Sequence, residues 1–323
     1  MDRAIILRVA GDPEVLKSEP ITVGAPGNGQ VRLTHTAIGV NFHDCYVRSG
    51  LYSTLALPGI PGLEAVGTVD AVGPDVADFC PGDCVGYITR QYGGYATARL
   101  IEASALIRLP QSVDDRTAAA TLLRGLTAQA LVRYVCPVRA GQTVLVHAAA
   151  GGVGRLIAQW AHHLGATVIG TVGSEEKAAL ARANGCAHTI RYRTENFVDK
   201  VRDITNGRGV DVVYDSVGKD TFAGSLQSLA MRGHLANFGQ SSGPIEPFHI
   251  STLFEKSNSV SRANVFHYFT GDDREPMAKA LYSALAEGVI TPGDFHEYAF
   301  DDAAKAHADM EARKTAGAVL LIP

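Results

Sequence analysis

The sequence lacks the features of a small disulfide-rich or metal-stapled protein. It has one tryptophan, four methionines and five cysteines in 323 residues, and the cysteines are scattered and odd in number. A disulfide framework is therefore not expected. Cys80 and Cys84 flank a Pro-Gly turn, but no second cysteine pair and no histidine stand at ligand spacing, so we interpret them as two thiols beside a turn.

The sequence also lacks a basic excess and a long apolar run. Lys and Arg number 29 against 33 Asp and Glu, which gives a net charge of −4 and argues against a general polyanion-binding surface. No apolar stretch reaches membrane length, and residues 1–3 lead into a strand rather than a signal peptide. We expect a cytoplasmic protein with no membrane partner and no nucleic-acid partner.

Two patterns of secondary structure follow each other along the chain, and its length predicts two domains. Residues 1 to about 105 show closely spaced strands and turns, typical of a small β-barrel-like domain. From Asp115 helices and strands alternate, which predicts a parallel sheet with ligands beyond the carboxyl ends of its strands. The later elements are expected as helices over 175–184, 195–205, 219–231, 275–287 and 302–313, and as strands over 210–215, 233–238 and 318–322. The last strand must join a sheet, most economically that of the N-terminal domain.

A strand–turn–helix–strand unit at residues 143–172 organises the chain. The pattern indicates a buried strand over 143–146, a helix over 153–161 and a second strand over 167–172. In the turn, Gly151, Gly152 and Gly154 remove the Cβ atoms that would block a pyrophosphate from the backbone N–H groups at a helix N-terminus. Ala149 occupies the first glycine position of the usual G-x-G-x-x-G pattern. The unit predicts a dinucleotide site.

The end of the second strand bears on the choice of cofactor. An NAD site places Asp or Glu there, about 20 residues past the glycines, to hold the ribose 2′-OH. Here the strand ends in Gly173-Ser174, with Lys177 one turn into the next helix, which favours the 2′-phosphate of NADPH. Glu175 and Glu176 leave NADH open, since either carboxylate could approach the ribose. A further alternative is that Ser174 is only the N-cap of this helix and Lys177 a solvated charge.

The chain resembles, over its full length, the medium-chain dehydrogenase/reductase superfamily, and within it the zinc-independent quinone oxidoreductases. The motifs that carry the resemblance are GDPEVL at 11–16, NFxDxYxRSGLY at 41–52, GD at 82–83, HAAAGGVG at 147–154, GTVG at 170–173, YDSVG at 214–218, FGxSSG at 238–243 and LLIP at 320–323. The resemblance implies an α/β protein with a Rossmann doubly wound parallel sheet plus a GroES-like, mainly β catalytic domain. The expected boundaries are 1–123 for the GroES-like catalytic domain, 124–262 for the Rossmann NADPH-binding domain and 263–323 for a return segment that completes the catalytic domain.

The resemblance also implies NADPH as the cofactor and a homodimer as the assembly. Carried over by motif, the cofactor-binding residues are Asn41, Tyr46, Thr127, Gly151, Gly152, Val153, Gly154, Gly173, Ser174, Lys177, Tyr192, Phe238, Gly239, Ser241 and Arg313. Of these, Lys177, Tyr192 and Arg313 would hold the 2′-phosphate, because Arg offers a bidentate fork and Lys a point charge.

The zinc ligands of the superfamily's alcohol dehydrogenases are not found at the matching positions. Those enzymes carry a cysteine where Asn41 stands and Gly-His-Glu where Gly62-Leu63-Glu64 stands. The four-cysteine structural zinc lobe is missing too. With two of three catalytic ligands absent, we expect no metal. Arg124 and the segment 261–265 depart from the quinone oxidoreductase pattern, which leaves the identity of the acceptor open.

The resulting hypothesis is a zinc-independent enzyme in which NADPH donates hydride to a quinone or another conjugated carbonyl. Asn41, Tyr46 and Tyr52 are the candidate catalytic residues, because their polar groups can hydrogen-bond a developing oxyanion; packing against the cofactor is the alternative role. Two other functions stay open: an enone or enoyl thioester reductase, and a weakly catalytic NADPH-binding protein that is crystallin-like or RNA-binding. The acidic balance counts against an RNA role.

Overall fold

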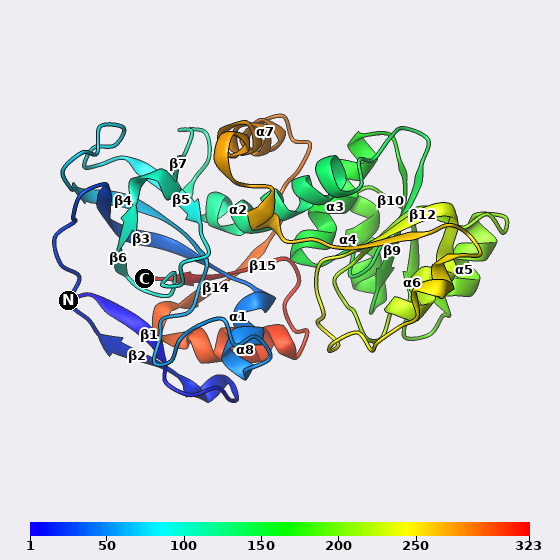
Figure 1. The fold of residues 1–323 in the computed structure, drawn as a ribbon, viewed down its shortest axis with the longest axis horizontal. Helices are drawn as coiled ribbons and strands as arrows, with labels where there is room; N and C mark the ends of the chain where they lie inside the picture. The colour runs from blue at the N-terminus through cyan, green and yellow to red at the C-terminus, as the bar shows by residue number, and fades with distance from the viewer. The chain divides into compact units, whose positions relative to one another are not determined.

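The structure, a computed structural model, describes residues 1–323, and the chain divides into two compact units. The first unit comprises Met1–Leu123 and Pro292–Pro323, and the second comprises Arg124–Thr291. Each unit has its own sheet and its own apolar core. Figure 1 shows the C-terminal strands β14 and β15, in orange to red, within the first unit among strands from the N-terminal part of the chain.

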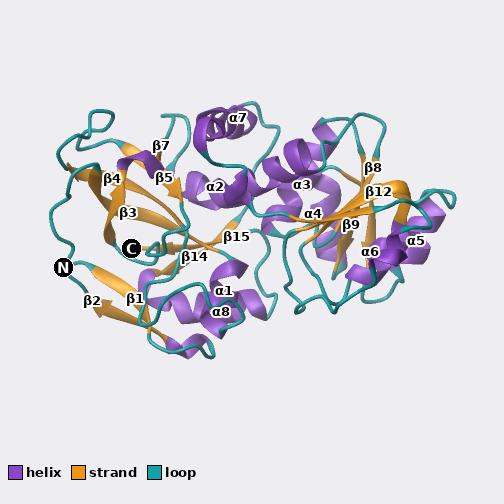
Figure 2. Ribbon diagram, in the orientation of Figure 1, coloured by secondary structure: helices purple, strands orange, loops and turns teal.

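The first unit is built mainly of strands (Figure 2). Its strands are β1 (Arg3–Leu7), β2 (Leu16–Pro20), β3 (Gln30–Val40), β4 (Glu64–Val72), β5 (Cys84–Ile88), β6 (Ala98–Glu102), β7 (Leu106–Arg108), β14 (Phe295–Ala299) and β15 (Ala318–Ile322), and its helices are α1 (Phe42–Ser49) and α8 (Ala303–Glu311). The helix α2 (Asp115–Ala130) begins in this unit. The main sheet runs β14-β15-β3-β4-β5-β7 with β6 also paired to β3, while β1 and β2 form a separate antiparallel pair.

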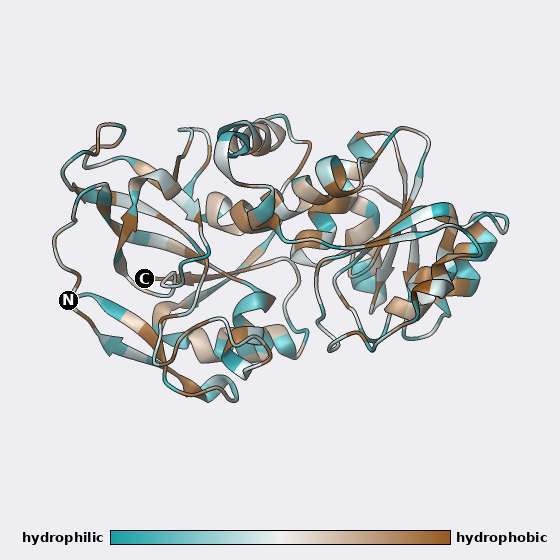
Figure 3. Ribbon diagram, in the orientation of Figure 1, coloured by the Kyte–Doolittle hydropathy of each residue, from teal (hydrophilic) through white to brown (hydrophobic).

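The long strand β3 is the centre of this sheet. Val31 and Leu33 are buried, whereas Arg32 between them is only partly buried, which is the alternation of a strand with one face on the core. Towards its end, residues 37–40 are all buried, which indicates that both faces of the strand are covered there. Figure 3 shows that hydrophobic and hydrophilic residues are interspersed along the helices and strands.

The expectation that the last strand joins the N-terminal sheet is confirmed. β15 pairs antiparallel with β3, with Leu320 opposite Gly39, and parallel with β14 on its other side. The side chains of Leu320 and Leu321 are fully buried. Burial of such an apolar strand removes it from water, and its edges are satisfied by two neighbours.

The second unit is a parallel sheet flanked by helices. Its strands are β8 (Thr143–Val146), β9 (Thr167–Val172), β10 (Cys186–Arg191), β11 (Val210–Asp215), β12 (Leu229–Asn237) and β13 (Ser259–Arg262). Its helices are α3 (Gly152–His163), α4 (Glu175–Ala183), α5 (Phe197–Ile204), α6 (Phe222–Ser228) and α7 (Arg274–Ala286), and a π-helical turn (Leu131–Val135) extends α2. The spatial order β10-β9-β8-β11-β12-β13 is all parallel. This is the 3-2-1-4-5-6 order of a Rossmann sheet. Successive strands are added on one side of β8 up to β10 and on its other side from β11 onwards, so the topological switch point lies between β8 and β11.

Two expectations about this unit need correction. The helix expected over 219–231 ends at Ser228, because Leu229 is fully buried, pairs with Val210 and starts β12. The return to the first unit, expected at residue 263, occurs at Pro292. Residues 263–291 stay with the second unit because α7 packs into its core, where Leu281 is fully buried against the backbone of Gly125. No helix of either unit combines the length and the apolarity that crossing a membrane would require.

Candidate functional site

The glycine turn after β8 is closed by backbone hydrogen bonds. Ala148 has a positive φ of 51°, and its carbonyl accepts from the N–H of Gly151, 2.8 Å away. Gly151 is the N-cap of α3 but offers no side chain, so the N–H groups of the first helical turn have no capping side chain. A Cβ at position 154 would overlap the carbonyl oxygen of Ala148, so only glycine fits there. The turn therefore places bare backbone donors at a helix N-terminus, as an anion site requires.

A cluster of buried polar side chains is centred on His147, at the start of this turn. His147 Nδ1 lies 2.9 Å from Thr171 Oγ1, and His147 Nε2 lies 2.9 Å from Ser225 Oγ. Burial lowers the pKa of His147, against an opposing effect of the Asp215 carboxylate. The ring is thus neutral, and it ties together the ends of β8 and β9 and the helix that follows β11.

The predicted residues Phe238, Gly239 and Ser241 lie at the same edge of the sheet as the glycine turn. The N–H of Phe238 donates to the carbonyl of Asp215 at 2.9 Å, and the N–H of Ser241 donates to the carbonyl of Ser216 at 3.2 Å. Asp215 is fully buried, and its Oδ1 accepts the N–H groups of Val217 and Gly218 at 2.8 and 3.1 Å. The loops after β11 and β12 are therefore fixed against each other beside the switch point, where ligands of such sheets bind.

The residues expected to choose the cofactor gather at the end of β9. Ser174 Oγ accepts the N–H of Lys177 at 3.3 Å, which confirms that Ser174 is the N-cap of α4. The Tyr192 side chain lies over Gly173, where a Cβ would come within 2.9 Å of the phenol oxygen. Gly173, Ser174, Lys177 and Tyr192 are thus close together in the second unit. Arg313, expected to join them, follows α8 with a φ of 58° and belongs to the first unit.

Asn41 begins α1 and is held at both its backbone and its side chain. Its backbone N–H donates to Asp44 Oδ2 at 2.8 Å, in a capping box. Its side-chain Nδ2 donates to Glu64 Oε1 at 2.7 Å, and Glu64 Oε2 accepts the N–H of Leu123 at 2.8 Å. The carboxylates of Asp44 and Glu64 are fully buried, and sequence reasoning gave them no role. Asp44 stands at the N3 position after Asn41, so the capping-box spacing was the available signal for it, whereas only the fold brings Glu64 to Asn41.

The candidate catalytic tyrosines lie in an aromatic cluster on the first unit. The rings of Tyr46 and Tyr52 meet edge to face with centroids 5.1 Å apart, and the ring of His43 meets that of Tyr52 at 5.4 Å. His43 Nε2 lies 2.8 Å from Tyr92 Oη, which also lies 2.6 Å from Thr54 Oγ1. Burial lowers the pKa of His43 to about 4, so at neutral pH the ring is a neutral hydrogen-bonding group. His43 and Tyr92 were missed as site residues; the density of aromatic and polar residues in 39–52 was the available signal.

The expected cofactor residue Thr127 and the departing segment 261–265 also belong to the second unit. Thr127 lies on α2, in the second unit. Arg262, from the departing segment at 261–265, donates to Asn237 Oδ1 and, at 2.8 Å, to the carbonyl of Gly239. It therefore braces the loop after β12, in which Gly239 is an expected cofactor contact.

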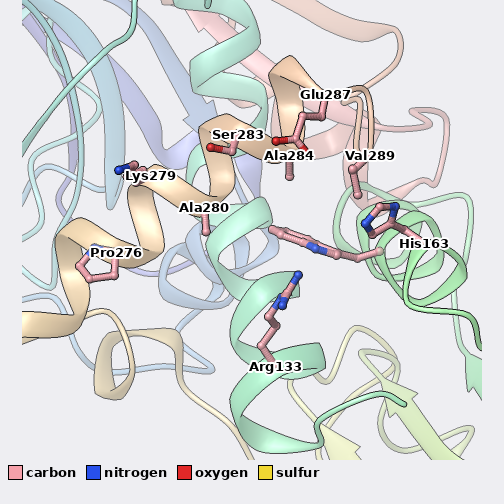
Figure 4. A pocket seen from close by; sticks show the side chains of 10 residues that line it. Arg133, His163, Pro276, Lys279, Ala280, Ser283, Ala284, Glu287 and Val289 are labelled. Atoms are coloured by element: carbon pink, nitrogen blue, oxygen red, sulfur yellow. The ribbon is translucent and has the colours of Figure 1, made fainter. Parts of the chain in front are cut away.

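A cavity of about 440 Å³ in the second unit lies away from these residues (Figure 4). It is lined by α7, the π-helical turn and the C-terminal end of α3, with Trp160 and His163 among its residues. The glycine turn is at the other end of α3, and a helix of 12 residues spans about 18 Å. This cavity is therefore not the predicted dinucleotide site.

Comparison with known proteins places these features in a family. Residues 152–283 match the family model described as zinc-binding dehydrogenase, and residues 27–111 match the alcohol dehydrogenase GroES-like domain. A quinone oxidoreductase of Pseudomonas aeruginosa is 42% identical over 325 residues, which cover 100% of both chains. The chain belongs to the quinone oxidoreductase family of medium-chain dehydrogenases/reductases. A Rossmann domain together with a GroES-like domain, the predicted α/β fold, is confirmed with it.

Members of the quinone oxidoreductase family and their relatives match the chain in structure as well as in sequence. The crystal structure of Escherichia coli quinone oxidoreductase complexed with NADPH has a TM-score of 0.97 and 39% identity, with 100% of both chains covered. A 2-haloacrylate reductase of a Burkholderia species is 42% identical over 331 residues, covering 100% of this chain and 99% of that protein.

The side chains of this family member do not fit a catalytic zinc of the alcohol dehydrogenase kind. At the matching positions Leu63 is a buried apolar residue, and Asn41 presents an amide that donates to Glu64. Both carboxylate oxygens of Glu64 already accept hydrogen bonds. No group of three His, Cys, Asp or Glu side chains in the structure is arranged to hold a metal ion. One carboxylate without histidine or thiolate partners is a poor zinc site.

Chelation is therefore expected to leave activity unchanged. Protein dialysed against EDTA should keep the rate of NADPH oxidation of the untreated protein, because none of the donors around Asn41 depends on a metal for its partner. Elemental analysis of the purified protein supplies the second measurement. About one tightly held zinc per chain, lost together with activity, would contradict the prediction.

Proposed function

We propose that the chain is an NADPH-dependent oxidoreductase that transfers hydride to quinones without zinc. The observation that carries the proposal is a full-length match to quinone oxidoreductases at 39–42% identity, combined with a glycine turn at the switch point of a Rossmann sheet. A Lys and a Tyr, instead of an acidic residue aimed at the ribose, stand at the end of β9.

We propose the following division of cofactor contacts. The backbone of Gly151 to Gly154, Val153 included, holds the pyrophosphate: Gly151 gives its own N–H to the Ala148 carbonyl and shapes the turn, and the N–H groups that follow it have no capping side chain. Lys177, Tyr192 and Arg313 hold the 2′-phosphate, next to Gly173 and Ser174. The remaining contacts are Thr127, Phe238, Gly239 and Ser241 from the Rossmann unit and Asn41 and Tyr46 from the GroES-like unit.

The residues of the GroES-like unit have a positioning task in this reaction. NADPH, when bound, supplies the hydride. Asn41, fixed through Asp44 and Glu64, and the tyrosines Tyr46 and Tyr52 would orient the acceptor and hydrogen-bond the oxygen on which negative charge develops. Because no residue set here supplies a Lewis acid for an ordinary ketone, the acceptor must already be activated by conjugation.

A second candidate is reduction of a carbon–carbon double bond conjugated to a carbonyl or carboxylate. The 2-haloacrylate reductase, at 42% identity over the whole chain, favours it as strongly as the quinone oxidoreductases favour the first. In both reactions hydride goes to an electron-poor conjugated acceptor. The two differ in the atom that accepts it and therefore in the shape of the acceptor pocket.

One panel of acceptors decides between these functions. We expect 1,4-benzoquinone to oxidise NADPH in a rapid, enzyme-dependent reaction. Simple alcohols with NADP⁺ should give no turnover, since hydrogen bonds from Asn41, Tyr46 and Tyr52 do not replace a metal ion in activating an alcohol oxygen. The measurement is the NADPH absorbance, with quinones, enones, enoyl thioesters, 2-haloacrylate and alcohols tested side by side. Faster turnover of enones or 2-haloacrylate than of quinones would favour the second candidate, reduction of a conjugated carbon–carbon double bond.

Two results of the panel would contradict both enzyme functions. Turnover of alcohols would require an activating group that the residues described do not provide. NADPH binding without turnover of any acceptor would favour a crystallin-like or RNA-binding role, for which AU-rich RNA binding at physiological salt is the next measurement.

We also propose that the protein is a homodimer and is located in the cytoplasm. The proposal rests on the family to which the chain belongs. Analytical ultracentrifugation checks the first part, with a sedimenting mass of twice the chain expected, and fractionation of expressing cells checks the second.

A further inference from the structure

Three arginines on the elements next to β9, at the end of α4, at the end of β10 and just after β10, differ in whether an acidic partner neutralises them. Arg182 Nη2 lies 2.7 Å from Glu175 Oε1, and Arg191 Nη1 lies 3.4 Å from Glu175 Oε2. Arg191 is further engaged by Glu195, which accepts its backbone N–H at 2.8 Å and faces its Nε at 3.8 Å. The third, Arg193, has no acidic partner.

The free arginine lies against the end of β9. The N–H of Tyr192 donates to the carbonyl of Val172 at 3.1 Å, which continues the β9–β10 pairing and carries the next residue alongside Gly173. A Cβ on Gly173 would lie 3.6 Å from Arg193 Nε. The Arg193 side chain is exposed, so its guanidinium is both accessible and close to the backbone that precedes Ser174.

The acidic side chains of the first turn of α4 are directed elsewhere. Glu175 reaches along α4 towards Arg182, seven residues and about two helical turns further on, away from the N-terminus of the helix. The pKa of Glu175 is lowered, first by its hydrogen bond with Arg182 and then by the charges of Arg182 and Arg191. Glu176 hydrogen-bonds with the Ser174 side chain, which lowers its own pKa. Neither carboxylate is left without a partner beside the ribose position.

We propose that Arg193 is a specificity-determining contact for the 2′-phosphate of NADPH, and that the Arg182–Glu175–Arg191 ion pairs keep the Glu175 carboxylate away from it. This proposal rests on the proposed function. It follows from position, because the end of the second strand of a Rossmann sheet is where the ribose 2′ group lies and where a nearby Arg accommodates a phosphate. An unpaired guanidinium can give a phosphate two parallel hydrogen bonds, which a residue already shared between carboxylates cannot.

The first test compares dissociation constants for NADPH and NADH by titration calorimetry. Arg193→Ala should weaken NADPH binding about tenfold or more and leave NADH binding within about twofold, since one charge-assisted contact is lost only with the phosphate. Arg193→Lys should recover part of the loss. Arg139→Ala is the matched control, because it also removes an exposed positive charge but lies just before the start of β8, at the opposite edge of the sheet.

The second test releases the carboxylate. Arg182→Ala removes the shorter of the two ion pairs of Glu175 and leaves the one with Arg191, so it should lower the NADPH-to-NADH affinity ratio by about twofold. Glu175→Gln in the same chain should restore the ratio, because the less restrained carboxylate and not the missing arginine repels the phosphate. Unchanged NADPH affinity in Arg193→Ala, with normal binding by the unmodified protein, would overturn this proposal and leave the proposed function intact. If the unmodified protein itself shows no preference for NADPH, the proposed cofactor fails instead.

Discussion

Replacing Gly154 with alanine is expected to weaken NADPH binding by about 100-fold or more. The added Cβ would overlap the carbonyl oxygen of Ala148, so the turn and the start of α3 must move apart. That carbonyl also accepts the N–H of Gly151, so the shift disturbs the backbone donors proposed to hold the pyrophosphate. Loss of two charge-assisted hydrogen bonds to the pyrophosphate, at about 1.5 kcal/mol each, amounts to on the order of 100-fold in affinity. Fluorescence titration with NADPH measures the effect.

Two other glycines supply the controls for this experiment. Gly24→Ala should bind NADPH normally, because its Cβ would meet no atom within 4 Å. Gly151→Ala should show a smaller loss than Gly154→Ala, because its Cβ would lie 3.1 Å from the Ala148 oxygen, a contact that a small adjustment relieves. The melting temperature separates loss of binding from loss of folding. Full NADPH affinity in Gly154→Ala would show that the turn is not the phosphate site.

Acidification from pH 6 to pH 4 is expected to destabilise the first unit by roughly 4–5 kcal/mol through two histidines alone. Burial lowers the pKa of both His35 and His307 from 6.5 to about 3. His35 is enclosed by the Ala96 carbonyl and the Tyr87 hydroxyl, with Arg99 close by, and His307 bonds only with the Tyr95 hydroxyl and lies near Arg48.

The sign follows from proton binding. Between pH 6.5 and pH 3 the unfolded chain protonates both imidazoles and the native unit does not, so stability falls as the pH falls through this window. Each histidine contributes about 1.4 kcal/mol per pH unit. Carboxylates add their own acid dependence, and a variant is needed to separate the two contributions.

His307→Gln provides that separation. Glutamine can still donate to Tyr95 but does not titrate, so the pH dependence should become shallower by about 1.4 kcal/mol per pH unit. His162→Gln, at an exposed site of the second unit, is the matched substitution against which this change is compared. Hydrogen exchange of the β3 amides reports the first unit, whereas the fluorescence of the only tryptophan, Trp160, reports the second. An identical slope in His307→Gln and the unmodified protein would contradict the buried, neutral state of this histidine.

The dinucleotide unit was predictable from the sequence because its determinants are local. The strands at 143–146 and 167–172 have the predicted bounds, and the terminal strand 318–322 has them too. Short apolar, β-branched runs bounded by glycines have few alternatives. The glycine turn was equally predictable, since glycine is the one residue without a Cβ and its position in the sequence marks where a Cβ would not fit.

Other features depend on contacts between residues far apart in the chain, and the spacing of residues in the sequence did not predict them. The Asn41–Glu64 and Tyr95–His307 bonds join positions 23 and 212 residues apart, and the return to the first unit at Pro292 follows from packing of α7 that no local pattern reveals. The ion pair between Glu175 and Arg191 is a further example, because these residues stand on α4 and β10 and meet only once the sheet has formed.

The sequence by itself thus determined the α/β class, the family and the kind of cofactor, because backbone conformation and periodicity are short-range properties of the chain. Only the tertiary structure decided which polar groups are paired. It buried Glu64 against Asn41, turned Glu175 away to Arg182, and left Arg193 unpaired beside Gly173. Pairing depends on distances of a few ångströms between distant segments, and such distances exist only after the sheets have formed.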